Sequence, residues 1–201
     1  MSIAQINFTI NQDFSKLVSI YDDINSRWID NKLPKETNLI LYSNLINNDY
    51  QIDLGPLGSL HVLDGLTDNK KTASFLFGKI IETNLSCYKK LKNDFKELDM
   101  GAVGLFRTIG NINTHVDINY QTLKSEKMCK LNYVFKECHC DAIFFVGNDS
   151  ANLTAGTAWL ADVTKLHGLR TNGLVYLLQL EFNNPYDQVL DWFQRTPNLS
   201  Y

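Results

Sequence analysis

The second half of this chain is a close succession of short β-rich runs, and this pattern limits the folds open to it. The runs follow Asp99 and are separated by polar or glycine-containing breaks, which is typical of strands joined by turns. Six such runs within roughly 80 residues predict an antiparallel sandwich or barrel. The runs are AVGLFRTI, NINTHVDINY, CKLNYVF, AIFFVG, TAWLADV and LVYLLQLEF.

The length and apolar content are those of a single domain. With 201 residues, 44% of them hydrophobic, the chain can bury one sizeable core. We expect residues 1–98 to form a buttress of helix and short strands, residues 99–182 the β core, and residues 183–201 a short helix and a tail. Within the buttress, apolar residues recur at helical spacing from Lys71 to Leu98. This spacing predicts one long helix packed on the sheet.

Charge and termini narrow the class of protein further. The formal net charge is -3, and the basic residues are scattered without a stripe that would neutralise a phosphate backbone, so nucleic acid is an unlikely partner. The sequence has no leader pattern and no long apolar run, so we expect a soluble cytoplasmic protein that needs no membrane. Its oligomeric state is left open.

The cysteines do not indicate a disulfide framework, because the chain can build a core without one. We interpret all four as reduced thiols. The run Cys138-His139-Cys140 suggests zinc ligands, but zinc sites usually separate their cysteines by two to four residues. Alternation along a strand would also point His139 away from the two thiols. A loop or edge strand with buried cysteines is the favoured interpretation, and His61 is interpreted as a hydrogen-bonded structural histidine.

His115 and Asp117 lie two residues apart in a run that reads as a strand, so their side chains project from the same face. Such a pair also occurs by chance, as a strand-end ion pair. His167 strengthens the metal interpretation, because it precedes the last long strand and intervening strands can return it to the same barrel mouth. Two imidazoles and one carboxylate on one side of a metal leave the opposite positions open, as non-haem iron(II) oxygenases require.

The runs INTHVDINY, CKLNYVF and AGTAWLADVTKLHGLRTNGLVYLLQLEF resemble the double-stranded β-helix core of 2-oxoglutarate/Fe(II)-dependent oxygenases. They are most similar to the aspartyl/asparaginyl β-hydroxylase and prolyl-hydroxylase-like branches. In those branches a glycine, an aspartate, a histidine and an asparagine recur in this order, and the corresponding residues here are Gly156, Asp162, His167 and Asn172. The resemblance covers roughly residues 101–182. It implies a mainly β, jelly-roll (cupin-like) fold with helical additions. It also implies Fe(II) held by the two histidines and the aspartate.

The resemblance further implies a basic residue for the distal carboxylate of 2-oxoglutarate. The related branch has an arginine about ten residues after the second histidine, where this chain has Tyr176 and Leu177. Lys130 is the favoured substitute, because related asparaginyl hydroxylases and jumonji-type proteins supply a lysine from this position. Asn132 would share its strand face.

Other polar residues are weaker candidates for the cosubstrate. A hydroxyl from Tyr176 or Tyr133 could add a hydrogen bond. Arg107 and Arg170 have the fork that suits a carboxylate, although a surface salt bridge explains each of them more simply. Asn172 has two readings, a cap on the turn after His167 or a hydrogen bond to the cosubstrate.

The resemblance therefore implies an Fe(II)- and 2-oxoglutarate-dependent dioxygenase that hydroxylates an amino-acid or peptidyl substrate. Its partners would be a small-molecule cosubstrate and an amino acid or protein. The missing arginine favours one alternative, a non-enzymatic jelly-roll module for binding or assembly. The abundance of asparagine, lysine and isoleucine would suit a phage or low-GC bacterial origin for such a module. A second alternative is a cupin-type metalloenzyme that uses no 2-oxoglutarate.

Overall fold

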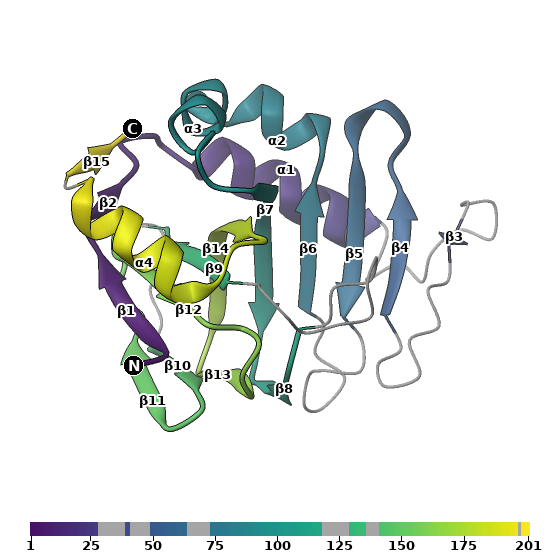
Figure 1. Cartoon of the computed structure of the whole chain (residues 1–201). Helices are drawn as coiled ribbons and strands as arrows, with labels where there is room; N and C mark the ends of the chain where they lie inside the picture. The colour runs from purple at the N-terminus through teal and green to yellow at the C-terminus, as the bar shows by residue number, and fades with distance from the viewer. Residues whose placement is uncertain (28–38, 41–48, 64–72, 118–128, 136–140, 197) are drawn as a thin grey trace.

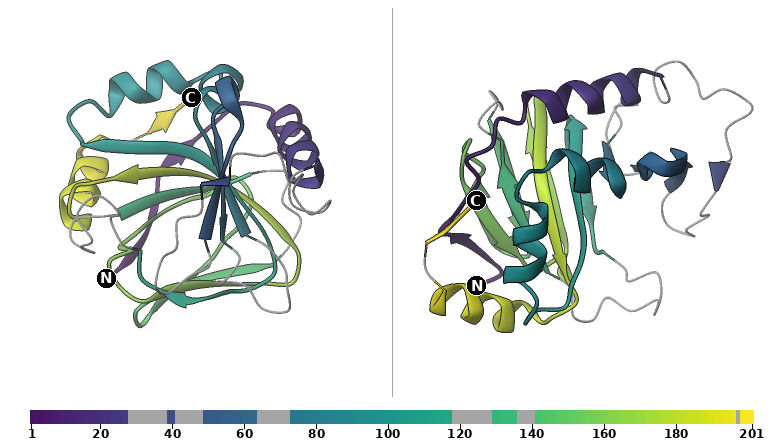
Figure 2. Two further views of the ribbon diagram at one scale, coloured as in Figure 1. Left: turned by 90° about the vertical axis from the view of Figure 1, so that its right-hand side faces the viewer. Right: turned by 90° about the horizontal axis from the view of Figure 1, so that it is seen from above.

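A computed structural model describes residues 1–27, 39–40, 49–63, 73–117, 129–135, 141–196 and 198–201 (Figure 1). The described residues are mainly β, with a larger and a smaller antiparallel sheet and a few helices. The left view of Figure 2 shows the smaller sheet on one side of the larger sheet and the helices around its other side.

The larger sheet contains nine strands in the order β1, β12, β9, β14, β7, β6, β5, β4 and β3. Every neighbouring pair runs antiparallel. The strands are β1 (Ile3–Ile6), β3 (Leu39–Ile40), β4 (Asp49–Asp53), β5 (Ser59–Leu63), β6 (Ala73–Phe77), β7 (Met100–Ile109), β9 (Cys129–Val134), β12 (Ala158–Ala161) and β14 (Leu174–Phe182).

The smaller sheet contains four strands in the order β11, β10, β13 and β8. They are β8 (Ile112–His115), β10 (Ala142–Val146), β11 (Asp149–Asn152) and β13 (His167–Thr171). A third, two-stranded pairing joins β2 (Phe8–Thr9) to β15 (Leu199–Ser200), so the C-terminal segment lies beside the segment that follows β1.

The strand order identifies the core as a double-stranded β-helix. Strand β7 pairs with β14, β8 with β13, β9 with β12 and β10 with β11. The chain therefore forms one long antiparallel ribbon, folded at the turn between β10 and β11 and wound so that successive segments alternate between the two sheets. This winding is the jelly-roll arrangement predicted from the sequence.

The hydrophobic core lies mostly on the outer face of the larger sheet. Leu131 and Tyr133 of β9 and Leu178 and Leu180 of β14 are fully buried there, and Tyr133 packs edge-on against Phe8. Helices and the N-terminal segment cover this face (Figure 2). The helices are α1 (Ser15–Asn25), α2 (Lys79–Asn84), α3 (Tyr88–Asp94) and α4 (Tyr186–Arg195).

The inner face of the larger sheet, which looks toward the smaller sheet, is more polar. Alternation along β9 places Lys130 and Asn132 on this face, opposite to Leu131 and Tyr133. Their cross-strand partners on β14 are Glu181 and Gln179. A polar group of side chains therefore lies on the inner face where β9 and β14 are paired.

The prediction of one long helix from Lys71 to Leu98 is wrong. The segment contains strand β6 and the two short helices α2 and α3. The run ASFLF is apolar except for Ser74 and is buried as an inner strand, a case that periodicity alone does not distinguish from a helix. Gly78 then adopts a φ of 94°, which ends the strand before α2 begins.

Other boundaries differ less. Helix α1 lies in the expected buttress but outside the stretch predicted to be its helix, and β11 and β13 were not among the strands predicted from the sequence. The short helix expected around Tyr186 to Phe193 is confirmed as α4.

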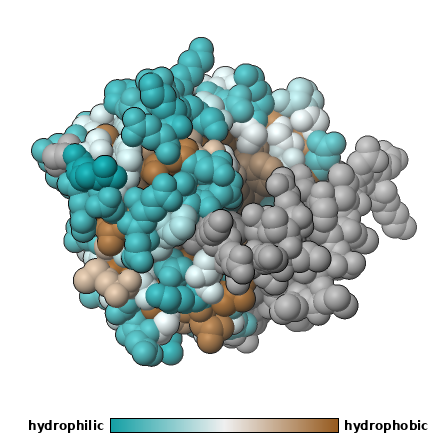
Figure 3. Space-filling model, in the orientation of Figure 1, coloured by the Kyte–Doolittle hydropathy of each residue, from teal (hydrophilic) through white to brown (hydrophobic). Residues whose placement is uncertain are grey.

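In the described part of the chain, no helix has the length and apolarity needed to cross a membrane. The coloured part of the face in Figure 3 is mostly hydrophilic, with apolar side chains exposed in small areas.

Candidate metal centre

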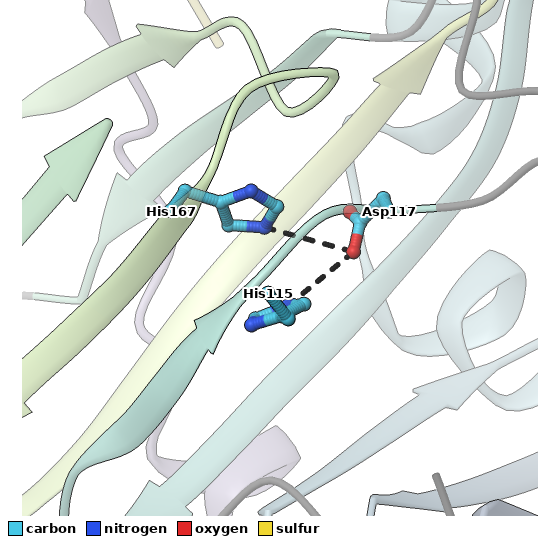
Figure 4. A group of neighbouring side chains, drawn as sticks. All are labelled: His115, Asp117 and His167. Carbon is cyan, nitrogen blue, oxygen red and sulfur yellow. Dashed lines mark ion pairs between the residues drawn. The ribbon is translucent and has the colours of Figure 1, made fainter. Parts of the chain in front are cut away.

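His115 and His167 are brought together by strand pairing in the smaller sheet. His115 ends β8, His167 begins β13, and the two residues are cross-strand partners. Their ring centroids are 4.3 Å apart. His167 is buried and His115 is partly buried, and both rings project toward Asp117 (Figure 4). Residues far apart in the sequence thus meet at one end of the jelly roll.

The backbone fixes the orientation of both imidazoles in the same way. Nδ1 of His115 lies 2.8 Å from the carbonyl oxygen of Asn113, and Nδ1 of His167 lies 2.9 Å from that of Lys165. In neutral histidine the Nδ1–H therefore donates to the carbonyl, which leaves the Nε2 lone pair directed at the centre of the site. Metal-binding histidines are commonly oriented through their second nitrogen in this way.

Asp117 completes the cluster. Its backbone N–H donates to the carbonyl of Val163 at 3.1 Å, which holds the residue beside the loop between β12 and β13. Its Oδ1 lies 3.4 Å from Nε2 of His115 and 3.6 Å from Nε2 of His167. One candidate ligand atom from each of the three residues lies within 4.8 Å of the other two.

The two Oδ1–Nε2 separations, 3.4 and 3.6 Å, are longer than usual hydrogen bonds and close to the spacing of atoms that share a metal ion. Ligand atoms about 2.1 Å from an ion and about 90–110° apart lie roughly 3.0–3.4 Å from one another. A direct N–H···O hydrogen bond is usually shorter, about 2.9 Å. Two imidazoles and one carboxylate on one side of an ion are also a donor set suited to a divalent transition metal. The residues therefore fit the group that the sequence predicted.

Electrostatics keep the Asp117 carboxylate charged. Burial by itself would raise the pKa of Asp117, but the ammonium group of Lys130 and the nearby imidazoles outweigh it, and the pKa lies well below the usual value. Lys130 Nζ is 2.7 Å from Asp117 Oδ2. Asp117 faces the two histidines with Oδ1 and Lys130 with Oδ2. The ion pair with Lys130 therefore does not occupy the oxygen that would bind a metal ion.

Lys130 has a second carboxylate partner. Glu181 Oε1 lies 3.1 Å from Lys130 Nζ, and the Lys130 side chain is only 17% exposed. Burial alone would lower the pKa of Lys130, but Asp117 and Glu181 raise it above its usual value. Lys130 is therefore a charged lysine held between Asp117 and Glu181 of β14.

Two amides continue the polar lining beyond Lys130. Gln179 Nε2 donates to Asn132 Oδ1 at 2.7 Å. Asn132 is 2% exposed, and among the described residues its Nδ2 has no hydrogen-bond partner. Trp159 of β12 is the cross-strand partner of Asn132 on its other side, and its indole N–H donates to Thr157 at 2.9 Å. Asn132 is thus placed beside Lys130 with an unused donor group.

The structure does not bring Tyr176 to this cluster. Tyr176 lies on the outer face of β14, and its hydroxyl donates to Asp22 of α1. Arg107, its cross-strand partner on β7, binds the same carboxylate through Nε at 3.0 Å. Tyr133 also faces outward and donates to the carbonyl of Ile10 at 3.2 Å. These three residues attach α1 and the N-terminal segment to the sheet.

Arg170 and Asn172 also lie outside the cluster. Arg170 is exposed on the outer face of β13, with its guanidinium 5.8 Å from the centre of the Phe145 ring. Asn172 accepts a hydrogen bond from the backbone N–H of Asp141 at 3.1 Å and donates to its carboxylate at 3.3 Å. The turn-capping interpretation of Asn172 therefore agrees with its contacts.

Sequence analysis missed Glu181, Gln179 and the position of His61. In LVYLLQLEF, Gln179 and Glu181 are the polar residues of an otherwise apolar strand, and this alternation was an available signal. His61 lies on β5, on the same face of the sheet as Phe75 and Phe106. Burial, together with a smaller contribution from the charge of Lys130 and against an opposing one from Asp117, lowers its pKa to about 4. His61 is therefore within electrostatic range of the cluster.

Two of the four cysteines, Cys87 and Cys129, belong to the described residues. Cys87 and Cys129 are buried free thiols, as expected. Burial raises the pKa of Cys87 to about 11, which makes it an unreactive thiol at neutral pH. Cys138, His139 and Cys140 lie outside the described residues.

Comparisons with known proteins give structural likenesses only. No protein-family model and no curated protein matches the sequence. A prolyl-4-hydroxylase from Pseudomonas putida is 12% identical, with 91% of this chain and 92% of that chain covered and a TM-score of 0.44. A 2OG-Fe(II) oxygenase family oxidoreductase from Burkholderia pseudomallei is 9% identical, with 85% and 80% covered and a TM-score of 0.38.

A predicted oxalate decarboxylase from Thermotoga maritima is 12% identical, with 60% of this chain and 89% of that chain covered and a TM-score of 0.39. We base the assignment of a jelly-roll fold on the strand order of this chain, and we base the candidate site on its own geometry.

Proposed function

We propose that this protein is an Fe(II)-dependent oxygenase that uses 2-oxoglutarate as cosubstrate. One observation carries the proposal. Nε2 of His115, Nε2 of His167 and Oδ1 of Asp117 converge at one end of the jelly roll, with both imidazoles oriented by backbone carbonyls (Figure 4). A facial set of two histidines and one carboxylate leaves the remaining positions of an octahedral ion open for other ligands.

Each residue of the cluster has a distinct part in this proposal. His115, Asp117 and His167 would hold the ion. Lys130 would supply positive charge to the carboxylate of the cosubstrate, and the unpartnered amide donor of Asn132 would contact the same molecule. When bound, Fe(II) and 2-oxoglutarate would supply the oxidising chemistry with dioxygen as the oxidant, one of its oxygen atoms going to succinate and the other to a substrate C–H bond.

The substrate class rests on the resemblance of the sequence alone. It favours hydroxylation of an amino-acid or peptidyl side chain, with a small-molecule cosubstrate and an amino acid or protein as partners. The test for this class is incubation with candidate peptides and free amino acids under air, followed by mass spectrometry. The expected product carries one added oxygen atom, and succinate is released in equal amount.

Anaerobic titration tests the iron and cosubstrate assignments separately. Purified metal-free protein receives Fe(II) and then 2-oxoglutarate, and the visible charge-transfer absorption of a chelated 2-oxo acid is followed. We expect the absorption to appear in the wild type, to vanish in His115→Ala, and to need a higher 2-oxoglutarate concentration in Lys130→Ala. Failure of the wild type to bind Fe(II) would contradict the metal assignment.

One observation favours a second candidate function. Lys130 already contacts two carboxylates, and Leu177 stands where the related branch has an arginine. A cupin-type metalloprotein that uses no 2-oxoglutarate would need no free cation at this position. Binding of one metal ion per chain with no response to 2-oxoglutarate would favour this candidate over the oxygenase.

A further inference from the structure

Glu181 is a carboxylate inside the jelly roll that neither the metal centre nor the core requires. It lies near the end of β14, directly opposite Lys130 of β9, and its side chain is 23% exposed. The alternating pattern of β14 directs it, like Gln179, toward the smaller sheet. An acidic residue at such a position costs desolvation free energy, so its contact with Lys130 needs an explanation.

In the metal-free protein, the side chains around Lys130 do not attract an incoming anion. Lys130 carries the one positive charge, and both Asp117 and Glu181 lie within an ion-pair distance of its ammonium group. The three side chains therefore have a combined charge of −1. Two carboxylates therefore already share the charge of this one ammonium group, which an incoming carboxylate would also have to approach.

The two carboxylates differ in how they can respond to a bound metal. Asp117 presents Oδ1 to the histidines and Oδ2 to Lys130, so it can hold an ion and keep its contact with the lysine. Among the described residues, Glu181 forms an ion pair with Lys130 and none with the histidines. Glu181 is therefore the group whose contact an incoming carboxylate would replace or crowd.

We propose that Glu181 is a selectivity residue that competes with the distal carboxylate of a dicarboxylate cosubstrate for Lys130. The inference rests on the proposed function and adds to it. A 2-oxo acid whose far end is uncharged avoids the repulsion, whereas 2-oxoglutarate places a second negative charge beside Glu181. Glu181 thus lowers the affinity for dicarboxylates. It reduces the preference for dicarboxylates over monocarboxylates that Lys130 alone would create.

The neutral variant Glu181→Gln separates this role from simple packing, because glutamine keeps the shape and still accepts a hydrogen bond from Lys130. The protein is loaded with Mn(II) under air-free conditions, and calorimetry gives the dissociation constants of 2-oxoglutarate and 2-oxopentanoate, a monocarboxylate of equal chain length. We expect Glu181→Gln to bind 2-oxoglutarate about tenfold more tightly, while the affinity for 2-oxopentanoate changes less than about twofold.

Two further variants control for folding and for total charge. Glu181→Asp keeps the negative charge and should keep the weak binding of 2-oxoglutarate. Asp23→Asn removes one charge from the exposed side of α1, which lies on the outer face of the larger sheet, and should leave both affinities unchanged. Thermal unfolding of each variant confirms that it is folded before titration.

The outcomes distinguish this inference from the proposed function. If Mn(II) binds and 2-oxopentanoate chelates normally, but Glu181→Gln fails to tighten 2-oxoglutarate binding, the selectivity role is overturned and the oxygenase proposal stands. An equal gain for both acids also overturns it, because the effect would then lie at the metal. If Mn(II) binds to no form of the protein, the metal assignment fails, and the selectivity role fails with it.

Discussion

His115 and His167 are direct cross-strand partners in the pairing of β8 with β13. The candidate metal centre therefore depends on the register of two strands that are separated by four other described strands along the chain. Because side chains alternate along a strand, a slip of one residue in either strand would turn one imidazole away from Asp117.

Metal binding should stabilise the fold and should depend on these histidines. An ion held by both strands binds the folded chain and not the unfolded one, so at about 100 times its dissociation constant it adds about 2.7 kcal/mol to the free energy of unfolding. Thermal unfolding with and without Mn(II) measures this. The variants His115→Gln and His167→Gln should lose the shift. Equal stabilisation in His167→Gln would show that the ion binds elsewhere.

Gly168 should control the geometry of the site without contacting it. A Cβ atom at Gly168 would lie 2.8 Å from the backbone oxygen of Ile112 and 2.5 Å from the Phe145 ring. Gly168→Ala must therefore push β13 away from β8, at a cost of about 1–3 kcal/mol in unfolding free energy, and should weaken Mn(II) binding. Urea unfolding and metal titration measure the two effects.

Gly101→Ala is the matched control for this variant. The nearest atoms to its added Cβ lie 3.8 Å away, which is ordinary contact, and Gly101 also belongs to a strand. It should leave metal binding unchanged. If Gly168→Ala binds Mn(II) as tightly as Gly101→Ala does, close approach at Gly168 does not position His167.

Removal of Lys130 should be costly because it leaves two carboxylates facing each other. Lys130→Met removes the positive charge between Asp117 and Glu181, and we expect a loss of about 2–4 kcal/mol in unfolding free energy of the metal-free protein. Urea unfolding measures it. The double variant Lys130→Met/Glu181→Gln should recover part of the loss. Lys79→Met removes an exposed pair with Glu82 and should change stability by less than about 0.5 kcal/mol.

His61 should make the metal-free protein sensitive to mild acid. Burial, with a contribution from Lys130, lowers its folded-state pKa from 6.5 to about 4. The unfolded chain then binds more protons than the folded chain between these values, so stability falls as the pH drops from about 6.5 to about 4. Allowing for the partial exposure of the ring, this loss is about 1–2 kcal/mol.

The variant His61→Gln isolates this contribution. Urea midpoints measured across the same pH window should vary less in the variant than in the wild type. The contribution of Asp117 is separate, because its pKa lies well below the usual 3.8 and its stabilisation is lost only at more acidic pH. Parallel pH profiles for wild type and His61→Gln would contradict the assignment to His61.

The sequence by itself determined the strand-rich core, the short C-terminal helix and the order of the three metal-site residues. These features depend on local signals, namely alternation, turn residues and the two-residue spacing of His115 and Asp117. The run ASFLF misled the prediction of a helix because an apolar stretch has no periodicity when a strand is buried on both faces.

Only the tertiary structure decided which face of each strand looks into the jelly roll. Tyr176 and Arg170 were plausible cosubstrate residues in the sequence, yet packing turns both away from the metal centre. The contact of Lys130 with Glu181 depends on the register of β9 against β14, strands that are far apart in the chain. Such a register is set by burial of the whole outer layer, so no local pattern could have specified it.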